Sequence, residues 1–448
     1  MANNYLASTA QATDEQMAEL SQGLSNLQLS DKRVILSNPG TMFNDIYYSR
    51  LNTVQSLAEV TYNTGRYQQS LSSPQFGGTS TVIIPNGSLL ASFYLHLEIT
   101  PNVSVPDATL PRGWGFAALR QVAYLMGSSN VPNISLDKHS ILQVIMGQCE
   151  NAEKRSEMFH LAGEEVFGLV AGVTYAADLI IPLPWSSAAG RTQKLPLPTD
   201  LLTNPITVQI SFDRGDAFFG GSGASKPSAF SQALALMRQG DMLNRDAGLR
   251  NLMLKNPSLI YGYPFIHFQS NQLGLPITST ASQTITWTGF INADLLGISF
   301  GLVANTDLIS TAGSNVRPFN YQELSNIEVL FNGLTMHLSP GRMHKLTNMN
   351  SMNGSSSFQN SNITQATTVA PYTSNPVDTY IVWIDFSRLK CEQFTDHYDN
   401  VWRVPNNTIT MKFAVPGGAI VGGAQLLATF LYSGIANLRQ GETTIFFD

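Results

Sequence analysis

Apolar and polar residues alternate with a period of two along much of the chain, the pattern of β-strands that bury one face. The clearest run is Leu89–Thr100. Four apolar residues in it alternate with more polar ones: Phe93, Leu95, Leu97 and Ile99 against Tyr94, His96 and Glu98. Because His96 falls on the more polar face, a solvated or cross-strand role is favoured over metal binding. Ser80–Ile84 is a second β-rich run, and Pro85-Asn86-Gly87 between the two predicts a hairpin turn.

The stretch Pro111–Met126 predicts another strand with one buried face. Trp114 and Phe116 lead into an apolar run whose second part, Val122–Leu125, has the regular strand pattern. After a polar loop, Leu136-Asp137-Lys138-His139 opens a helical stretch that we expect to end near Met158. The next predicted strands are Asp178–Trp185 and Pro205–Phe212.

The second half of the chain repeats this order of strands. Phe319–Phe331, Tyr380–Phe386 and Thr408–Val415 correspond to the strands at Trp114, Asp178–Trp185 and Pro205–Phe212. Their distances along the chain are nearly constant: 205 residues from Trp114 to Phe319, 201 from Trp185 to Phe386 and 202 from Ile206 to Thr408. The remaining predicted strands of this half lie in Leu259–Phe268, Gln283–Val303, Gln425–Tyr432 and Thr443–Phe447. The near-constant spacing predicts a duplicated all-β unit.

A length of 448 residues suits two domains of about 200 residues each. Asp213–Ser228 is rich in Gly and Ser and predicts a linker, after which Ser228 caps a predicted helical run, Ala229–Arg238. We therefore divide the chain into an N-terminal arm, residues 1–30, a first β unit, residues 31–222, and a second unit, residues 223–448. The second unit would open with the linker and the short helix.

The N-terminal arm lacks the alternation of the other segments. Thr13–Leu27 is a helix candidate, because Thr13 and Gln16 fit a capping box. Its apolar stripe consists of Met17, Leu20, Leu24 and Leu27. This stripe could pack on its own domain or contact a neighbouring molecule, a membrane or a scaffold. A third alternative is that the arm is mostly disordered.

The composition favours a protein with packed cores and argues against nucleic-acid-binding, secreted and membrane-spanning proteins. Hydrophobic residues make up 43% of the chain, enough for packed cores, while charged residues make up only 12%, about half of the usual share. The net charge is −6, and no useful cluster of Lys and Arg exists, which argues against direct nucleic-acid binding. The N-terminus lacks the pattern of a secretory signal, so we do not expect secretion. No apolar run reaches transmembrane length.

We find no pattern that predicts catalysis, a cofactor or a metal site. The seven histidines form no His-x-x-x-His or Glu-x-x-His pair, which disfavours zinc. Asp396-His397-Tyr398-Asp399 lacks an accompanying nucleophile pattern and is interpreted as a polar surface loop. Cys149 and Cys391 are expected to be buried thiols in a reducing compartment. Arg214-Gly215-Asp216 is an integrin-type tripeptide, but so short a motif is common by chance.

Several motifs, taken in order, resemble the first jelly roll of double jelly-roll major capsid proteins of large icosahedral viruses, the adenovirus and nucleocytoplasmic large DNA virus-like lineage. That family carries a W-G-F-A-L-[IL]-[RK]-x-[IV] strand, an I-D-[RK]-[HQ] element with a helix, and an I-P-L-P-[FW] strand. The matching residues here are Trp114-Gly115-Phe116-Ala117, Leu119-Arg120, Val122, Leu136-Asp137-Lys138-His139 and Ile181-Pro182-Leu183-Pro184-Trp185. A Leu-Pro loop and a further strand follow in both, here at Leu195-Pro196-Leu197 and Ile206–Ile210. The turn after the first strand departs from the family pattern.

The resemblance implies an all-β fold of two tandem jelly-roll sandwiches with short inserted helices. It implies a capsid protein without enzymatic activity or cofactor, assembled as a homotrimer into pseudo-hexameric tiles of a virion shell. Expected partners are further copies, minor capsid or penton proteins and an inner layer or membrane reached by the arm. Synthesis would take place in the host cytoplasm or nucleus.

A rival interpretation is a carbohydrate-binding or carbohydrate-processing protein made of two β-sandwiches. It requires acids and aromatics clustered on one face. The five tryptophans mostly lie within apolar strands, which favours core positions. Size in solution separates the two: a large trimer supports the shell and a monomer supports the rival.

Overall fold

The computed structural model describes most of the two predicted β units. The described residues are 64–71, 74–84, 89–125, 134–148, 152–183, 197–199, 204–220, 226–240, 261–279, 281–288, 295–308, 316–331, 333–341, 368–369, 372–373, 381–385, 408–439 and 442–447. The predicted arm, with Met17, Leu20, Leu24 and Leu27, lies outside them. Trp185, Cys149, Cys391 and the segment 396–399 also lie outside.

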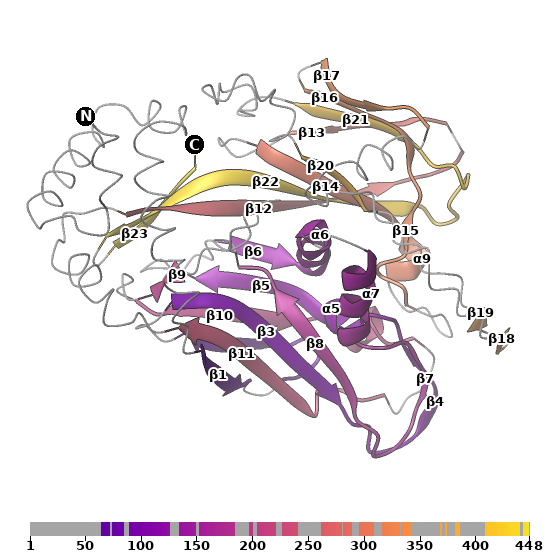
Figure 1. Ribbon diagram of the computed structural model, residues 1–448. Coiled ribbons are helices and arrows are strands. Elements are labelled where there is room, and N and C mark those ends of the chain that lie inside the picture. Colours follow the sequence, from indigo (N-terminus) through magenta and orange to yellow (C-terminus); the bar gives the residue numbers. More distant parts are fainter. Residues whose placement is uncertain are drawn as a thin grey trace, which may run out of the picture.

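The first unit is a sandwich of two antiparallel sheets (Figure 1). One sheet has the order β1 (Thr64–Ser70), β11 (Gln232–Gly240), β3 (Leu89–Ile99) and β8 (Tyr175–Ile181), with the short β9 (Leu197–Pro198) also on β3. The other has the order β2 (Thr79–Ile84), β10 (Ile206–Phe212), β5 (Leu119–Leu125) and β6 (Ile134–Asp137). A two-stranded sheet, β4 (Val105–Leu110) with β7 (Val166–Leu169), extends one end.

The alternation in the sequence determines which faces meet in this sandwich. On β3, Phe93, Leu95, Leu97 and Ile99 are fully buried, as predicted. On β10, Ile206, Val208 and Ile210 are fully buried. Because side chains alternate between the two faces of a strand, each sheet presents one apolar face, and the two faces form the core between them.

The second unit repeats the order of the main strands of the first. One sheet has the order β12 (Tyr261–Leu275), β22 (Ala424–Arg439) and β14 (Leu295–Ala304), with β15 (Tyr321–Gln322) and β20 (Val382–Asp385) on β14 and β23 (Glu442–Phe447) on β22. The other has the order β13 (Gln283–Trp287), β21 (Ile409–Ala414), β16 (Ser325–Phe331) and β17 (Leu334–Ser339). A small separate ladder joins β18 (Thr368–Val369) and β19 (Tyr372–Thr373).

These matching orders confirm the duplication predicted from spacing. The three predicted strand pairs are β5 with β16, β8 with β20, and β10 with β21, and each pair has the same place in its sandwich. Two packed antiparallel sheets with this crossing order form a jelly roll. The fold is therefore all-β, with two tandem jelly rolls and short helices, in agreement with the expectation from sequence.

Within the described residues, helices lie only in the connections between strands. They are α5 (Trp114–Ala118), α6 (Lys138–Gln148), α7 (Ala152–Leu161), the 3₁₀ turn η3 (Gly215–Ala217) and α9 (Asn305–Leu308). The helical stretch predicted from Leu136 to Met158 is present as two helices, α6 and α7, and Leu136 and Asp137 belong to the strand before them. The residues that lead into the Val122 strand, Trp114–Ala118, are helical, so this part of the strand prediction is wrong.

The predicted hairpin and the predicted linker are also wrong. β2 and β3 do not form a hairpin, because β2 pairs with β10 in one sheet and β3 pairs with β11 and β8 in the other. The chain crosses between sheets at this point, as the jelly-roll topology requires. The predicted linker also contains core residues, since Phe218 and Phe219 are fully buried.

The helical run predicted at Ala229–Arg238 is the strand β11, which lies between β1 and β3 of the first sandwich. A boundary at residue 222 would remove this central strand from its sheet. We therefore propose that the two units divide between Gly240 and Tyr261. Gly240 ends β11, a strand of the first sandwich, and Tyr261 begins β12, a strand of the second.

Candidate functional site

A connected set of buried polar side chains joins the two sandwiches, and we call it the joint. It is built around α6, which lies between the two units in Figure 1. The helix starts in the motif Leu136-Asp137-Lys138-His139. Asp137 accepts a hydrogen bond from the backbone N–H of Ser140 at 2.7 Å, which caps the first turn. Each of the next two residues makes a different long-range contact.

Lys138 attaches the start of α6 to its own unit, and His139 attaches it to the other unit. The Lys138 ammonium forms an ion pair of 2.7 Å with Asp213, which follows β10 of the same unit. The side chains of Lys138 and Asp213 are 12% and 22% exposed, so water screens this pair less than a surface pair. His139 points to the other unit, where its Nδ1 lies 2.9 Å from the hydroxyl oxygen of Tyr321.

The His139–Tyr321 contact is a bond between neutral groups. Burial, together with the nearby Lys138 charge, lowers the pKa of His139 to about 3. Burial raises the pKa of the Tyr321 hydroxyl well above its usual range. The contact therefore keeps its protonation state across the physiological pH range. It acts as a structural bond, because neither group is poised to exchange a proton.

A second polar cluster lies one turn further along α6. The Thr429 hydroxyl donates to the Gln143 side-chain oxygen at 2.7 Å and lies 2.9 Å from the Ser140 hydroxyl. The Gln143 amide nitrogen in turn donates to the backbone carbonyl of Leu427 at 3.3 Å. All three side chains, from two units, are at most 1% exposed.

Apolar contacts surround these bonds. The sheet that carries β14 and β22 turns its second face toward the first unit, and side chains from it join the first unit's core cluster: Phe268, Val303, Leu427 and Leu431. Phe319 and Tyr321, before and within β15, join the same cluster. Gly301 makes room for the tyrosine, since a Cβ there would lie 2.2 Å from the ring.

The joint can therefore hold the two sandwiches in one relative orientation. Apolar packing alone tolerates sliding, whereas a buried polar group that loses its partner costs about 1–3 kcal/mol. Any rotation that separates His139 from Tyr321 or Gln143 from Thr429 carries this cost. The role of the joint is therefore structural: it sets the relative orientation of the two sandwiches.

Sequence reasoning found one side of the joint. The Leu136-Asp137-Lys138-His139 motif was identified through its resemblance to the capsid family, but without a role for each residue. Tyr321, Gln143 and Thr429 were missed. A signal for Gln143 is present, because a polar residue interrupts the apolar run Ile141–Ile145 of α6.

The other sequence candidates are placed as follows. His96 has the predicted cross-strand role, with its ring 2.7 Å from Asp178 on the neighbouring strand. Asp216 of the Arg-Gly-Asp tripeptide is exposed, in the 3₁₀ turn η3. Trp114 and Trp287 are core residues, at 1% and 4% exposure. In the part of the chain that the structure describes, no three His, Cys, Asp or Glu side chains are grouped to hold a metal ion. Nor is any helix there long and apolar enough to cross a membrane.

An exposed apolar tip lies at the end of the first sandwich formed by β4 and β7, which we call the β4–β7 tip. Its side chains are Val103, Phe167, Val170 and Val173, at 41–60% exposure. Hydrogen bonds hold its two loops together, from Gly172 N–H to the Pro101 carbonyl and from Ala171 N–H to the Ser104 hydroxyl, both 2.9 Å. Grouped apolar side chains of this kind mark contact surfaces.

Solved structures of viral capsid proteins share this fold. The chain superposes on the virus capsid of PBCV-1 with a TM-score of 0.58 and 13% identity, covering 86% of this chain and 97% of that one. For the Faustovirus major capsid protein the TM-score is 0.55 at 8% identity, over 88% and 98% of the two chains. For the Sputnik virophage structure it is 0.53 at 10% identity, over 86% and 89%. The predicted resemblance to double jelly-roll capsid proteins is thus confirmed at the level of the fold.

No protein-family model matches the sequence, and no curated protein does. The likeness to capsid proteins therefore rests on the arrangement of the strands.

Proposed function

We propose that this chain is a major capsid protein that assembles with copies of itself into an icosahedral viral shell, without enzymatic activity. The observation that carries the proposal is the double jelly roll, which matches viral capsid proteins over 86–88% of this chain in the three comparisons above. The low content of charged residues, 12%, suits a chain that lies beside copies of itself.

We further propose that three copies form a trimer. Each chain supplies two similar sandwiches, so three chains place six similar units around one axis. Closed rings of this kind are the usual outcome of symmetric assembly. A tile with six similar sides requires a constant angle between the two sandwiches of each chain, and the buried polar bonds of the joint support such an angle. The β4–β7 tip is available for contacts beyond the trimer.

Purification in the native state tests this function. We expect a trimer by light scattering and shells or tiles by cryo-electron microscopy. A monomer that binds oligosaccharides in calorimetry would instead support the carbohydrate-binding rival. The described tryptophan side chains, Trp114 and Trp287, favour the capsid role because both are buried and unavailable to stack on a sugar.

The N-terminal arm is proposed to act in assembly. Met17, Leu20, Leu24 and Leu27 form one apolar stripe in the sequence, and a lone helix of this length is marginal in water, so the stripe needs a partner. We propose that this partner is a neighbouring subunit, a minor capsid protein or an inner layer such as a membrane. The net charge of −6 and the lack of a Lys and Arg cluster give no basis for direct binding of nucleic acid.

Deleting residues 1–30 should leave a folded trimer but reduce shell assembly, because both described sandwiches close without these residues. Gel filtration reports the trimer and electron microscopy reports the shell. A matched variant that replaces Met17, Leu20, Leu24 and Leu27 with Ser tests the stripe alone. Loss of the trimer would assign the arm to the folded core, and normal shells would refute its assembly role.

A further inference from the structure

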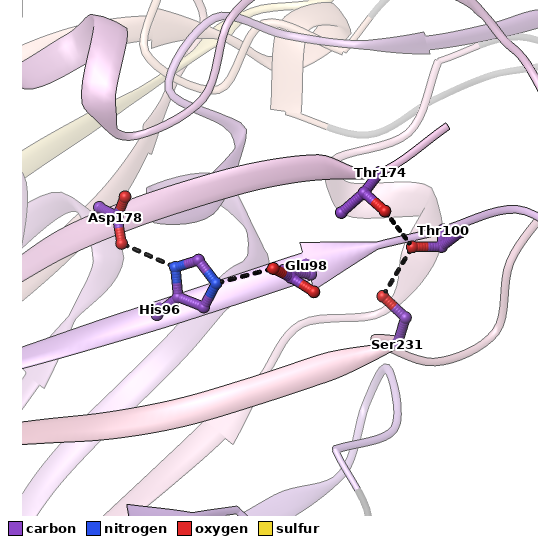
Figure 2. A network of polar contacts seen from close by, with 6 residues as sticks. All are labelled: His96, Glu98, Thr100, Thr174, Asp178 and Ser231. Carbon is purple, nitrogen blue, oxygen red and sulfur yellow. Dashed lines mark hydrogen bonds and ion pairs between the residues drawn. The ribbon is translucent and has the colours of Figure 1, made fainter. Parts of the chain in front are cut away.

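His96 lies on the outer face of the first sandwich and contacts two carboxylates. It projects from β3, opposite Asp178 of β8 in the strand register. Its Nδ1 is 2.7 Å from Asp178 Oδ1, and its Nε2 is 3.0 Å from Glu98 Oε1 (Figure 2). The ring is 20% exposed, so most of it is shielded from water.

This geometry determines the charge of the ring. A neutral imidazole has a single N–H, so it can donate to one carboxylate and must present a lone pair to the other. Two ionised carboxylates at hydrogen-bond distance from both ring nitrogens are satisfied only when both nitrogens carry a proton. The arrangement therefore selects the imidazolium, with one positive charge between two negative ones.

No other described charged side chain faces His96 from the packed strands. On the side of β11, its register partner is Leu234, and the neighbouring outward residues Gln232 and Leu236 are also uncharged. Along the row beyond Glu98, only hydroxyl groups follow: Thr100 lies 2.9 Å from Thr174 and 3.2 Å from Ser231. Figure 2 shows these three hydroxyls joining the strand ends, and none of them carries a charge that titrates with His96.

β8 is the last strand in the hydrogen-bonded order of this sheet, and within the described residues it pairs with β3 alone. Strands with one ladder are the parts of a sheet that open most readily. We propose that charged His96, clamped between Asp178 and Glu98, fastens β8 to β3 and releases it as the pH rises. This clamp is independent of the proposed capsid function.

The direction of the pH effect follows from the balance of forces on the ring. Burial disfavours the charged ring, but the hydrogen bonds and charges of Asp178 and Glu98 outweigh it and raise the pKa of His96 above 6.5. Because the folded pKa is raised, the clamp contributes its full stability below the unfolded value of about 6.5. That contribution is lost as the pH rises through the folded pKa, when the cluster changes from one net negative charge to two.

Two buried histidines, His139 and His267, do not share this pH response. Burial, together with the Lys138 charge, lowers the pKa of His139 to about 3, and burial lowers the pKa of His267 to about 4. Both remain neutral through the range in which the clamp is lost. His160 is exposed on α7, with 61% of its side chain accessible, and pairs with Glu164 at 3.0 Å within its own segment. His160 therefore provides a matched control.

Hydrogen exchange of the full chain, read by mass spectrometry on peptides covering β8, tests the clamp. Between pH 6 and pH 9, we expect opening of β8 to increase about two- to tenfold more in the wild type than in His96→Gln. This factor corresponds to the loss of two partly exposed ion pairs. Comparison at equal pH removes the intrinsic pH dependence of exchange. His160→Gln should behave like the wild type. Asp178→Asn should reduce the pH effect and shift the titration of His96 toward lower pH, which NMR of labelled histidine measures.

The clamp would be refuted by equal pH dependence of β8 opening in wild type and His96→Gln. It would also be refuted if labelled His96 is neutral at pH 6. Should His96→Gln fail to fold, the Asp178→Asn titration and the wild-type NMR signal still decide the question.

Discussion

Tyr321→Ala should lower the free energy of unfolding by about 3–5 kcal/mol, the usual cost of truncating a buried aromatic side chain. The tyrosine is 1% exposed and packs on Gly301, so its removal leaves a cavity between the sandwiches. It also leaves His139 without the hydroxyl 2.9 Å from its Nδ1. We expect the variant to unfold in two separate transitions, because the units lose their shared packing, and to form few regular tiles.

Tyr321→Phe is the matched control for this prediction. It keeps the ring against Gly301 and removes only the hydroxyl, so the expected loss is about 1–3 kcal/mol, the cost of an unsatisfied buried polar group. Denaturant unfolding measures stability, and electron microscopy measures the regularity of assembled tiles. Stable, regularly assembling Tyr321→Ala protein would show that the joint does not set the angle between the units.

Trp114→Ala is expected to have a similarly large effect on the first sandwich, again about 3–5 kcal/mol. The indole is 1% exposed and lies against Gly163, where a Cβ would come within 2.2 Å of its Nε1. Hydrogen bonds from Gly113 N–H to the Gly163 carbonyl, 2.7 Å, and from Gly115 N–H to the Ala162 carbonyl, 2.9 Å, close the pocket around it. Removing the ring therefore empties a pocket that the backbone cannot readily collapse.

Leu161→Ala provides the comparison for Trp114→Ala. Leu161 ends α7 next to this pocket, but half of its side chain is exposed, so truncation should cost well under 1 kcal/mol. The two melting temperatures, measured under the same conditions, should differ by several degrees. Equal melting temperatures would place Trp114 outside the structural core.

The sequence alone determined which residues face the core in most strands. On β3, β10 and β21 the period of two is regular, and one face of each is buried as the pattern predicts. The repeat of about 200 residues likewise predicted two equivalent sandwiches, since an equal spacing of strands reflects an equal path through the sheets. The joint was partly visible too, in the motif that ends at His139.

Local signals were insufficient where the surroundings decide the conformation. Gln232–Gly240 contains Ala, Leu, Gln and Met, all good helix formers, yet it is a strand because β1 and β3 bond to both of its edges. Trp114–Ala118 is an unbroken apolar run, buried on all sides, and such a run does not distinguish a strand from a helix by its periodicity.

Only the tertiary structure could identify the partners across long distances. β2 and β3 are neighbours in sequence but enter opposite sheets, because a jelly roll satisfies their edges with strands from later in the chain. His139 meets Tyr321 across 182 residues, and Ser140 meets Thr429 across 289. Alternation and propensity describe a residue's own strand or helix. The partner of a buried polar group depends on how whole sheets pack, which the local pattern does not contain.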